Sequence, residues 1–217
     1  MKTLKYILLG VILTSLVFSS FSIYTSRKRG TQSTSVTFYE TYAQQEVLSG
    51  LDRGDRFFEL VNMENTDPES ALIGRCVETG LKDLQNYTQG ESFKTKVPKD
   101  LVIAAGELVK DHLISLYAIR ENSSTGEIPT GADLEEVSVS SSDDGENYML
   151  LFSFSKSGAE KWASMTRKNK GKDIAILSRG KVIAAPRVQE EIKDGKCAIS
   201  GSYTESEINS LKAEFEN

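Results

Sequence analysis

The N-terminus carries a run of 19 residues without a charged side chain, Tyr6–Tyr24. Two lysines precede this run, and the basic triplet Arg27–Arg29 follows it. As an α-helix, such a run spans roughly 28 Å, which is close to the thickness of the hydrocarbon core of a bilayer. The run therefore predicts a membrane-inserting helix and separates residues 1–29 from the rest of the chain.

Two interpretations of this helix stay open. The basic triplet after the apolar run favours a signal anchor that remains in the membrane. The small residues Ser20 and Ser22 are instead typical of the end of a cleaved signal peptide. A buried core helix is disfavoured because both ends of the run are charged. The positive charges on the two sides are nearly equal, so they do not set the orientation.

Composition limits the class of the remaining chain. The 217 residues are 39% hydrophobic and 26% charged, as in globular proteins, and two cysteines are too few for a disulfide scaffold. Without residues 1–29, the chain keeps 21 basic against 31 acidic residues. This balance argues against a nucleic-acid partner, which needs a basic face. It also predicts a domain that an anionic membrane surface repels.

Residues 30–96 are predicted to be a polar linker followed by a small N-terminal subdomain. Residues 30–36 show no apolar period. The run Phe57–Val61 is rich in apolar and aromatic residues, which predicts a strand. The Asp-Pro pair at 67–68 is typical of a helix start, and the apolar spacing after it predicts a helix to Leu84.

Residues 97–217 are predicted to form one α+β domain. The expected elements are strands at 101–105 and 113–120, a connector with a mobile loop over 121–147, a strand at 149–155, a helix with a capping box at Ser157–Glu160, strands at 173–177, 182–185 and 197–200, and a helix with a capping box at Thr204–Glu207. The order after residue 148 is β-α-β-β-β-α, which predicts an antiparallel or mixed sheet with helices on one face. Ile208, Leu211 and Phe215 are the expected buried stripe of the last helix.

Spaced glycines and one proline form a motif in the last third of the chain. Its members are Gly158, Gly171, Gly180, Pro186, Gly195 and Gly201. With the apolar segments between them, residues 157–217 resemble the large extracytoplasmic (head) domain of the SecD/SecDF protein-export subunits, and a thinner likeness begins near residue 97. Each motif residue also has a structural reading, such as a tight turn at Gly180 and a strand end at Pro186. The resemblance therefore predicts the architecture more firmly than an activity.

The resemblance implies a location and partners. It implies a domain on the extracytoplasmic, periplasmic side of the inner (cytoplasmic) membrane, held by a single N-terminal span, that contacts polypeptide or protein-export components. In the family, further membrane spans after this domain carry the proton-coupled work. Because the sequence ends at Asn217, we expect this chain to act passively, by binding. One departure is Arg179, which stands where the family usually has an acidic residue.

No catalytic, cofactor or metal motif is visible. His112 is the one histidine, and it lies in a charged turn without partners in sequence. The adjacent carboxylate pairs at 135–136, 143–144 and 190–191 cannot converge on one face of a strand or helix. Trp162, on an apolar helix face, is predicted to be a core residue. We therefore expect no enzymatic activity and no cofactor.

Cys76 and Cys197 allow two interpretations. They lack Cys-x-x-Cys spacing, so a redox or zinc motif is disfavoured. A disulfide between them would close a loop worth up to about 4–5 kcal/mol. Both lie in apolar patterns, which favours two separate buried thiols.

The functional hypothesis is a membrane-anchored, extracytoplasmic, non-catalytic binding module. The alternative is an envelope structural or interaction protein that uses the fold without a role in export. An apolar patch on the exposed face of the last sheet would favour the binding module.

Overall fold

The computed structural model describes residues 36–109, 112–121, 128–141 and 147–216. The chain divides into two compact units, and the described residues belong to the unit that spans 33–217. The membrane-inserting helix predicted within residues 1–29 lies outside the described residues. Among the helices that are described, none is long and apolar enough to cross a membrane.

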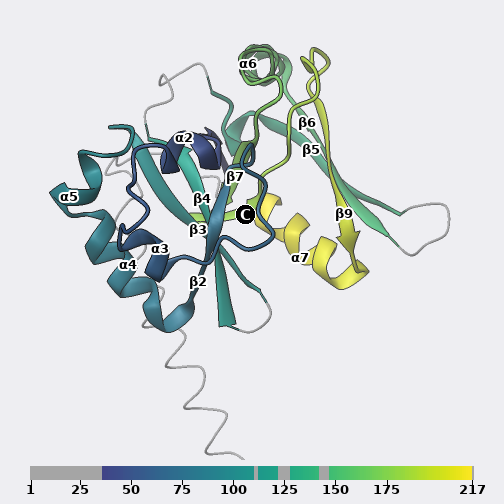
Figure 1. The fold of residues 1–217 in the computed structure, drawn as a ribbon. Helices are drawn as coiled ribbons and strands as arrows, with labels where there is room; N and C mark the ends of the chain where they lie inside the picture. The colour runs from purple at the N-terminus through teal and green to yellow at the C-terminus, as the bar shows by residue number, and fades with distance from the viewer. Residues whose placement is uncertain (1–35, 110–111, 122–127, 142–146, 217) are drawn as a thin grey trace, which may run out of the picture. The chain divides into compact units, whose positions relative to one another are not determined.

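The larger of two sheets has six strands (Figure 1). In spatial order they are β1 (Val36–Glu40), β7 (Ile174–Ser178), β8 (Lys181–Ala184), β3 (Leu101–Val109), β4 (Leu113–Arg120) and β2 (Leu72–Val77). Neighbours are antiparallel except β3 and β8, which run parallel where Gly106 faces Val182. Thr41, just after β1, forms a bridge to Ile119 of β4, so the sheet curls back toward its first strand.

The smaller sheet has three antiparallel strands, β5 (Leu134–Ser141), β6 (Tyr148–Phe154) and β9 (Lys196–Tyr203). Helices α6 (Lys156–Lys168) and α7 (Glu205–Glu216) pack on one face of it. On β6 this face carries Leu150, Phe152 and Phe154, which alternate with half-buried residues as a two-residue strand period requires. They share one core with Trp162 of α6 and Phe215 of α7.

Strand β7 is buried on both faces and joins two cores. Ile174 and Ile176 belong to the core of the small sheet, α6 and α7. Ala175 and Leu177 belong to a second core inside the curled six-stranded sheet, with Ala104 of β3. All five residues of β7 are buried, which explains the continuous apolar run in its sequence.

Short helices surround the β2 end of the large sheet. They are α2 (Gln44–Leu48), α3 (Phe57–Leu60), η2 (Glu78–Gly80), α4 (Leu81–Thr88) and α5 (Glu91–Lys94), while η4 (Gly131–Asp133) precedes β5. The rings of Phe57 and Phe93 stack with centroids 5.6 Å apart and tie α3 to α5. In Figure 1, α3, α4 and α5 lie together on one side of the sheet.

The α+β class is confirmed, and so are most elements after residue 100, but the strands after residue 148 lie in two sheets rather than in the one sheet that was predicted. The strands expected at 101–105, 113–120, 149–155, 173–177, 182–185 and 197–200 correspond to β3, β4, β6, β7, β8 and β9. The second capping box is also confirmed, because the Glu207 amide donates to Thr204 Oγ1 (3.3 Å) and the Thr204 amide donates to Glu207 Oε2 (2.8 Å). Ile208, Leu211 and Phe215 are the buried residues of α7.

Two predictions before residue 100 are wrong. Phe57–Val61 is not a strand: α3 occupies Phe57–Leu60, and the side chain of Asp55 accepts from the Phe57 amide at its start. The helix expected from residue 67 to Leu84 is also absent. The capping residues at 67–70 instead close a turn, β2 follows it, and only α4 from Leu81 is helical. A short apolar run is compatible with both a strand and a helix, and its packing partners decide between the two.

Three predictions in the last third need correction. The connector at 121–147 contains β5, because Val137 and Val139 face the core while Ser138 between them lies on the other face of the strand. Helix α6 is capped by Ser155 rather than Ser157, since Ser155 Oγ accepts from the Gly158 amide (3.3 Å). Strand β9 continues past Gly201 to Tyr203 instead of ending at the glycine.

The large sheet crosses the boundary expected between residues 96 and 97. β1 pairs along its whole length with β7, from Val36 opposite Ser178 to Glu40 opposite Ile174. β2 pairs with β4 on the other side of the sheet. Residues 36–96 therefore supply two strands to a sheet whose other four strands come from residues 101–184.

Replacing Phe215 by Ala is expected to lower the free energy of unfolding by about 3–5 kcal/mol, because the ring is buried and its centroid lies 5.2 Å from that of Phe152. Denaturant unfolding measures the change. The exposed Asn209→Ala on the same helix is the control and should shift stability by about 0.5 kcal/mol or less. A loss below about 1 kcal/mol for Phe215→Ala would contradict the packing of α7 on the small sheet.

Candidate binding site

Apolar surface is concentrated where strands β2, β3 and β4 end or begin. The large apolar side chains that stand exposed in the described part of the chain are Val77 (52%), Leu108 (52%) and Val109 (41%). Val77 and Val109 flank Leu113 in one cross-strand row. We call Val77, Leu108, Val109 and Leu113 the apolar corner. Isolated exposed apolar residues are common, but three at one sheet end are typical of a contact surface.

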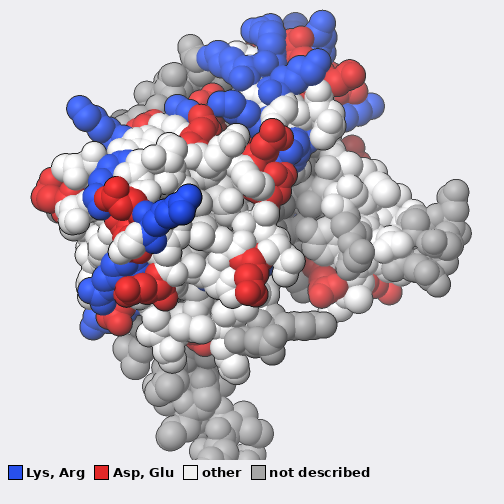
Figure 2. Space-filling model, viewed as in Figure 1, with Lys and Arg blue, Asp and Glu red and all other residues white. Residues whose placement is uncertain are grey.

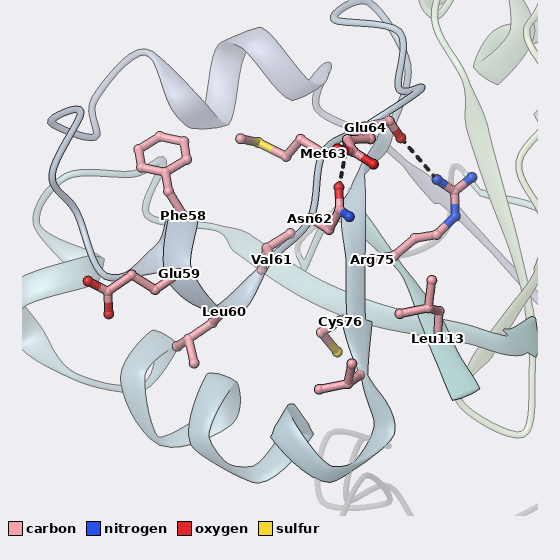
Figure 3. A pocket seen from close by; sticks show the side chains of 11 residues that line it. Phe58, Glu59, Leu60, Val61, Asn62, Met63, Glu64, Arg75, Cys76 and Leu113 are labelled. Carbon is pink, nitrogen blue, oxygen red and sulfur yellow. Dashed lines mark hydrogen bonds between the residues drawn. The ribbon is translucent and has the colours of Figure 1, made fainter. Parts of the chain in front are cut away.

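A groove of about 660 Å³ continues from the apolar corner (Figure 3). Its walls come from α3, from the segment that follows it, and from the ends of β2 and β4. The lining side chains are Phe58, Glu59, Leu60, Val61, Asn62, Met63, Glu64, Arg75, Cys76, Val77 and Leu113. Val77 and Leu113 belong to both features, so groove and corner form one continuous apolar surface.

The groove exists because the segment after α3 crosses close to β2. Asn62 and Arg75 exchange backbone hydrogen bonds of 2.8 and 2.7 Å. Gly74 allows this approach: a Cβ there would stand 2.4 Å from Val61 Cγ1 and 2.7 Å from the Asn62 carbonyl oxygen. Its φ of 153° is also rare for other residues. β2 is the last strand in the order of the sheet, so this pairing covers only part of its open edge.

A buried carboxylate holds α3 in place beside the groove. Asp55 accepts hydrogen bonds from the Phe57 amide (3.0 Å), from Lys96 Nζ (2.8 Å) and from the Tyr87 hydroxyl. Burial by itself raises the pKa of Asp55, but these three donors outweigh it and the net pKa is lowered. Asp55 is therefore a carboxylate at neutral pH that joins α3, α4 and the end of α5.

The groove contains one thiol and mainly apolar lining residues. Its one thiol, Cys76, is buried, and burial raises its pKa to about 11, so it stays protonated and weakly nucleophilic near pH 7. Across the residues that the structure describes, no three His, Cys, Asp or Glu side chains gather as metal ligands would. Apolar walls beside an open strand edge suit an extended apolar peptide.

The glycines of the sequence motif lie in the body of the fold, away from the groove. Gly171, Gly180 and Gly195 have positive φ, Pro186 accepts from the Ile174 amide, and Gly201 lies within β9. Gly158 lets α6 approach η4, because a Cβ there would be 2.7 Å from Asp133 Cβ. Arg179 and Gly180, with φ of 48° and 80°, form the two-residue turn between β7 and β8.

The two cysteines, Trp162 and His112 do not form a common site. Cys76 and Cys197 are free thiols in different sheets, and burial raises the pKa of both. Trp162 is a core residue with 3% exposure, as predicted. His112 is exposed, with its Nδ1 atom 3.8 Å from Glu78, just before β4.

An apolar patch on the outer face of the small sheet would have favoured the binding module. Among the described residues, this face carries no exposed large apolar side chain. Met149 and Leu151 point to that face but are half-buried, and small residues such as Ser138 and Ala198 stand beside Leu151. The apolar corner was missed because Val77 fell within a wrongly predicted helix. The pair Leu108-Val109, two apolar residues in an otherwise polar turn, was the signal that could have revealed it.

Comparison with known protein families gives a match in the C-terminal half of the chain. Residues 117–216 match the model of the SecDF P1 head subdomain. This part of the chain is similar to that subdomain. It contains the small sheet, α6, α7 and strands β7 and β8, whereas the groove and apolar corner lie before it.

Curated SecD proteins are also similar to this chain. The protein translocase subunit SecD of Acidaminococcus fermentans is 42% identical over 144 residues, which cover 64% of this chain and 33% of that protein. SecD of Sebaldella termitidis is 44% identical over 63 residues, covering 29% and 16%. The chain thus spans a third or less of these SecD proteins. A solved structure of SecDF, described as a membrane component that enhances protein export, is 16% identical to this chain. The alignment covers 83% of this chain and 92% of that chain, with a TM-score of 0.38.

Replacing Asp55 by Asn is expected to lower stability by about 1–3 kcal/mol at pH 7, since the buried donors lose a charged acceptor. A lowered folded-state pKa stabilises the protein above about pH 4, and this contribution is lost as pH falls through the folded-state pKa. The difference in stability between the unchanged protein and Asp55→Asn should therefore shrink below about pH 4. Thermal unfolding as a function of pH measures it. The control is Asp52→Asn, whose side chain is 85% exposed. An equal loss in both variants would show that Asp55 does not anchor α3.

Proposed function

We propose that this chain is a membrane-anchored, non-catalytic module of the protein-export machinery that binds apolar stretches of unfolded polypeptide. The match of residues 117–216 to the SecDF P1 head subdomain supports the link to export. The observation that carries the binding role is the apolar corner with its groove, at the open edge of β2. An envelope protein with a purely structural role has no need of this surface.

The groove also fits polypeptide better than a compact small molecule. It is bounded on one side by a strand edge, and an extended peptide can add hydrogen bonds to such an edge while its alternate side chains enter the groove. Leu60, Met63 and Val77 offer apolar contacts, and the charged side chains of the lining are Glu59, Glu64 and Arg75. Flexible Met side chains are typical of surfaces that accept varied ligands.

The proposed location is the extracytoplasmic side of the inner membrane, with Tyr6–Tyr24 as an uncleaved anchor. The basic triplet after the apolar run supports retention, and the family resemblance supports the sidedness. Without a charged side chain in this run, the proposed anchor has no carrier for a proton. We infer that the module works by binding and that a partner supplies any energy.

A labelled, unfolded apolar polypeptide should bind the detergent-solubilised chain with a Kd on the order of 1 μM, as in transient contacts. Val77→Asp and Leu108→Asp should each weaken binding about tenfold or more, because a carboxylate must then be desolvated against an apolar ligand. Fluorescence anisotropy measures the affinity. Both positions are about half exposed, so the substitutions leave the cores intact.

The matched control for these variants is Ala198→Asp, an exposed position on the outer face of the small sheet. It adds the same charge at a distance from the groove and should leave binding within about twofold. Loss of binding in Ala198→Asp alone would move the site to the small sheet. Absence of binding in the unchanged protein would favour the structural alternative.

Protease added to cells with a permeabilised outer layer should digest the folded unit and spare a short membrane stub. The expected stub ends near residue 36, where β1 begins. Immunoblotting with tags at each end distinguishes the stub from the released domain. Protection of the whole chain until the membrane is dissolved would place the domain in the cytoplasm and contradict the proposal.

A further inference from the structure

Charge is unevenly distributed over this acidic chain. Residues 156–196 contain eleven lysines and arginines but only five aspartates and glutamates. The rest of the chain after residue 29 contains ten basic and 26 acidic residues. Figure 2 shows Lys and Arg side chains gathered over α6, at the top of the view. The chain is therefore strongly dipolar, although its net charge is negative.

The densest cations lie at the C-terminal end of α6 and just after it. They are Arg167, Lys168, Lys170, Lys172 and Lys193, which we call the basic end. All five are exposed. Lys193 is brought to this end of the helix by Glu191, which pairs with Arg167 (3.3 Å) and with Lys193 (3.7 Å).

Local carboxylates neutralise the basic end only in part. Glu191 is shared by two cations, and Lys172 Nζ lies 3.9 Å from Glu46, at the limit of an ion pair. Lys170 has no ion-pair partner among the residues that the structure describes. Two cations in the last turn, Arg167 and Lys168, are enough to complement the helix dipole. The other three cations serve no such purpose within the fold.

We infer that the basic end docks on the anionic phospholipid headgroups of the membrane that holds the chain. The inference rests on the proposed membrane anchor. Lysines are effective ligands for phosphate as point charges, and each basic residue near an anionic bilayer contributes to attraction that adds up over the cluster. An acidic domain on a tether is pushed away from such a surface in every orientation except the one that presents its cations.

The tether is long enough for this orientation. Residues 25–35 join the apolar run to β1, and eleven residues reach at most about 36–40 Å. The chain enters the fold at Val36, and the other end of β1 lies by α6, where Asn169 Nδ2 donates to Glu40 Oε1 (3.2 Å). β1 itself measures only about 14 Å. The basic end can therefore turn to the bilayer while the domain stays tethered.

This docking would leave the groove accessible. In Figure 1, α6 lies at the top, whereas the ends of β2 and β3 that carry the apolar corner lie at the bottom. When the basic end faces the membrane, the apolar corner points toward the aqueous side. A polypeptide that has left the membrane can then reach it.

The test uses residues 33–217, which form a compact unit with cores of their own and can be studied without the apolar run. Cooperative unfolding first confirms that each variant is folded. The unit should co-sediment with phosphatidylcholine vesicles that contain about 30% phosphatidylglycerol, but not with pure phosphatidylcholine. Binding should be lost when salt is raised from about 0.05 M to about 0.5 M.

The double variant Lys170→Glu with Lys172→Glu should weaken vesicle binding about tenfold or more. The matched control, Lys82→Glu with Lys94→Glu, changes the net charge equally on exposed lysines of α4 and α5 and should stay within about twofold. Equal loss in both double variants would overturn the inference, because it would reduce the effect to net charge. Binding of polyglutamate without binding of anionic vesicles would also overturn it and assign the basic end to an acidic protein.

The vesicle measurement is independent of polypeptide binding. Val77→Asp should weaken binding of the apolar polypeptide about tenfold or more and leave vesicle binding unchanged, because the apolar corner lies away from α6. Failure of the lysine variants to respond, with Val77→Asp behaving as expected, would refute the docking of the basic end alone. The opposite pattern would refute the polypeptide site and retain the docking.

Discussion

The fold depends on the burial of β7 between two cores. Its even-numbered residues pack with the small sheet, α6 and α7, and its odd-numbered residues Ala175 and Leu177 pack inside the large sheet. A strand buried on both faces cannot leave one core without exposing the other. β1, from the beginning of the described chain, pairs with β7 along its whole length. The part that matches the SecDF head family and the part before it are therefore one structural unit.

Asp173, immediately before β7, strengthens this link with polar contacts. Its Oδ2 atom accepts from the Ala71 amide (2.7 Å), and its Oδ1 atom accepts from Arg187 Nε (3.1 Å). Its backbone oxygen accepts from Thr41 Oγ1 (2.6 Å). Three segments thus meet at one buried residue: two contact its carboxylate and one contacts its backbone oxygen. The loop before β2 is held there, which sets the start of the strand whose far end borders the groove.

The sequence was informative where elements carry their own signals. The capping box at Thr204, the period of α7 and the apolar run of β7 are local, so the last third could be predicted with small errors at its caps. The region before residue 100 could not, because its elements are decided by distant partners. The cap-like residues at 67–70 close a turn once β2 pairs with β4, and Phe57 turns helical because Asp55 and Phe93 hold it. The groove depends on such contacts, so it was invisible in the sequence.

The two candidate surfaces differ in how they recognise a partner. The binding proposed for the apolar corner relies on burial, which is non-directional and changes little with salt, so it would tolerate varied polypeptide sequences. The basic end relies on charge, which acts over about a Debye length and orients the domain before any contact forms. Because β7 couples the two parts of the unit through shared cores, an orientation imposed at α6 is transmitted to the groove without a conformational change. In the proposed module, charge would set the direction in which the domain faces, and burial would provide the contact with polypeptide.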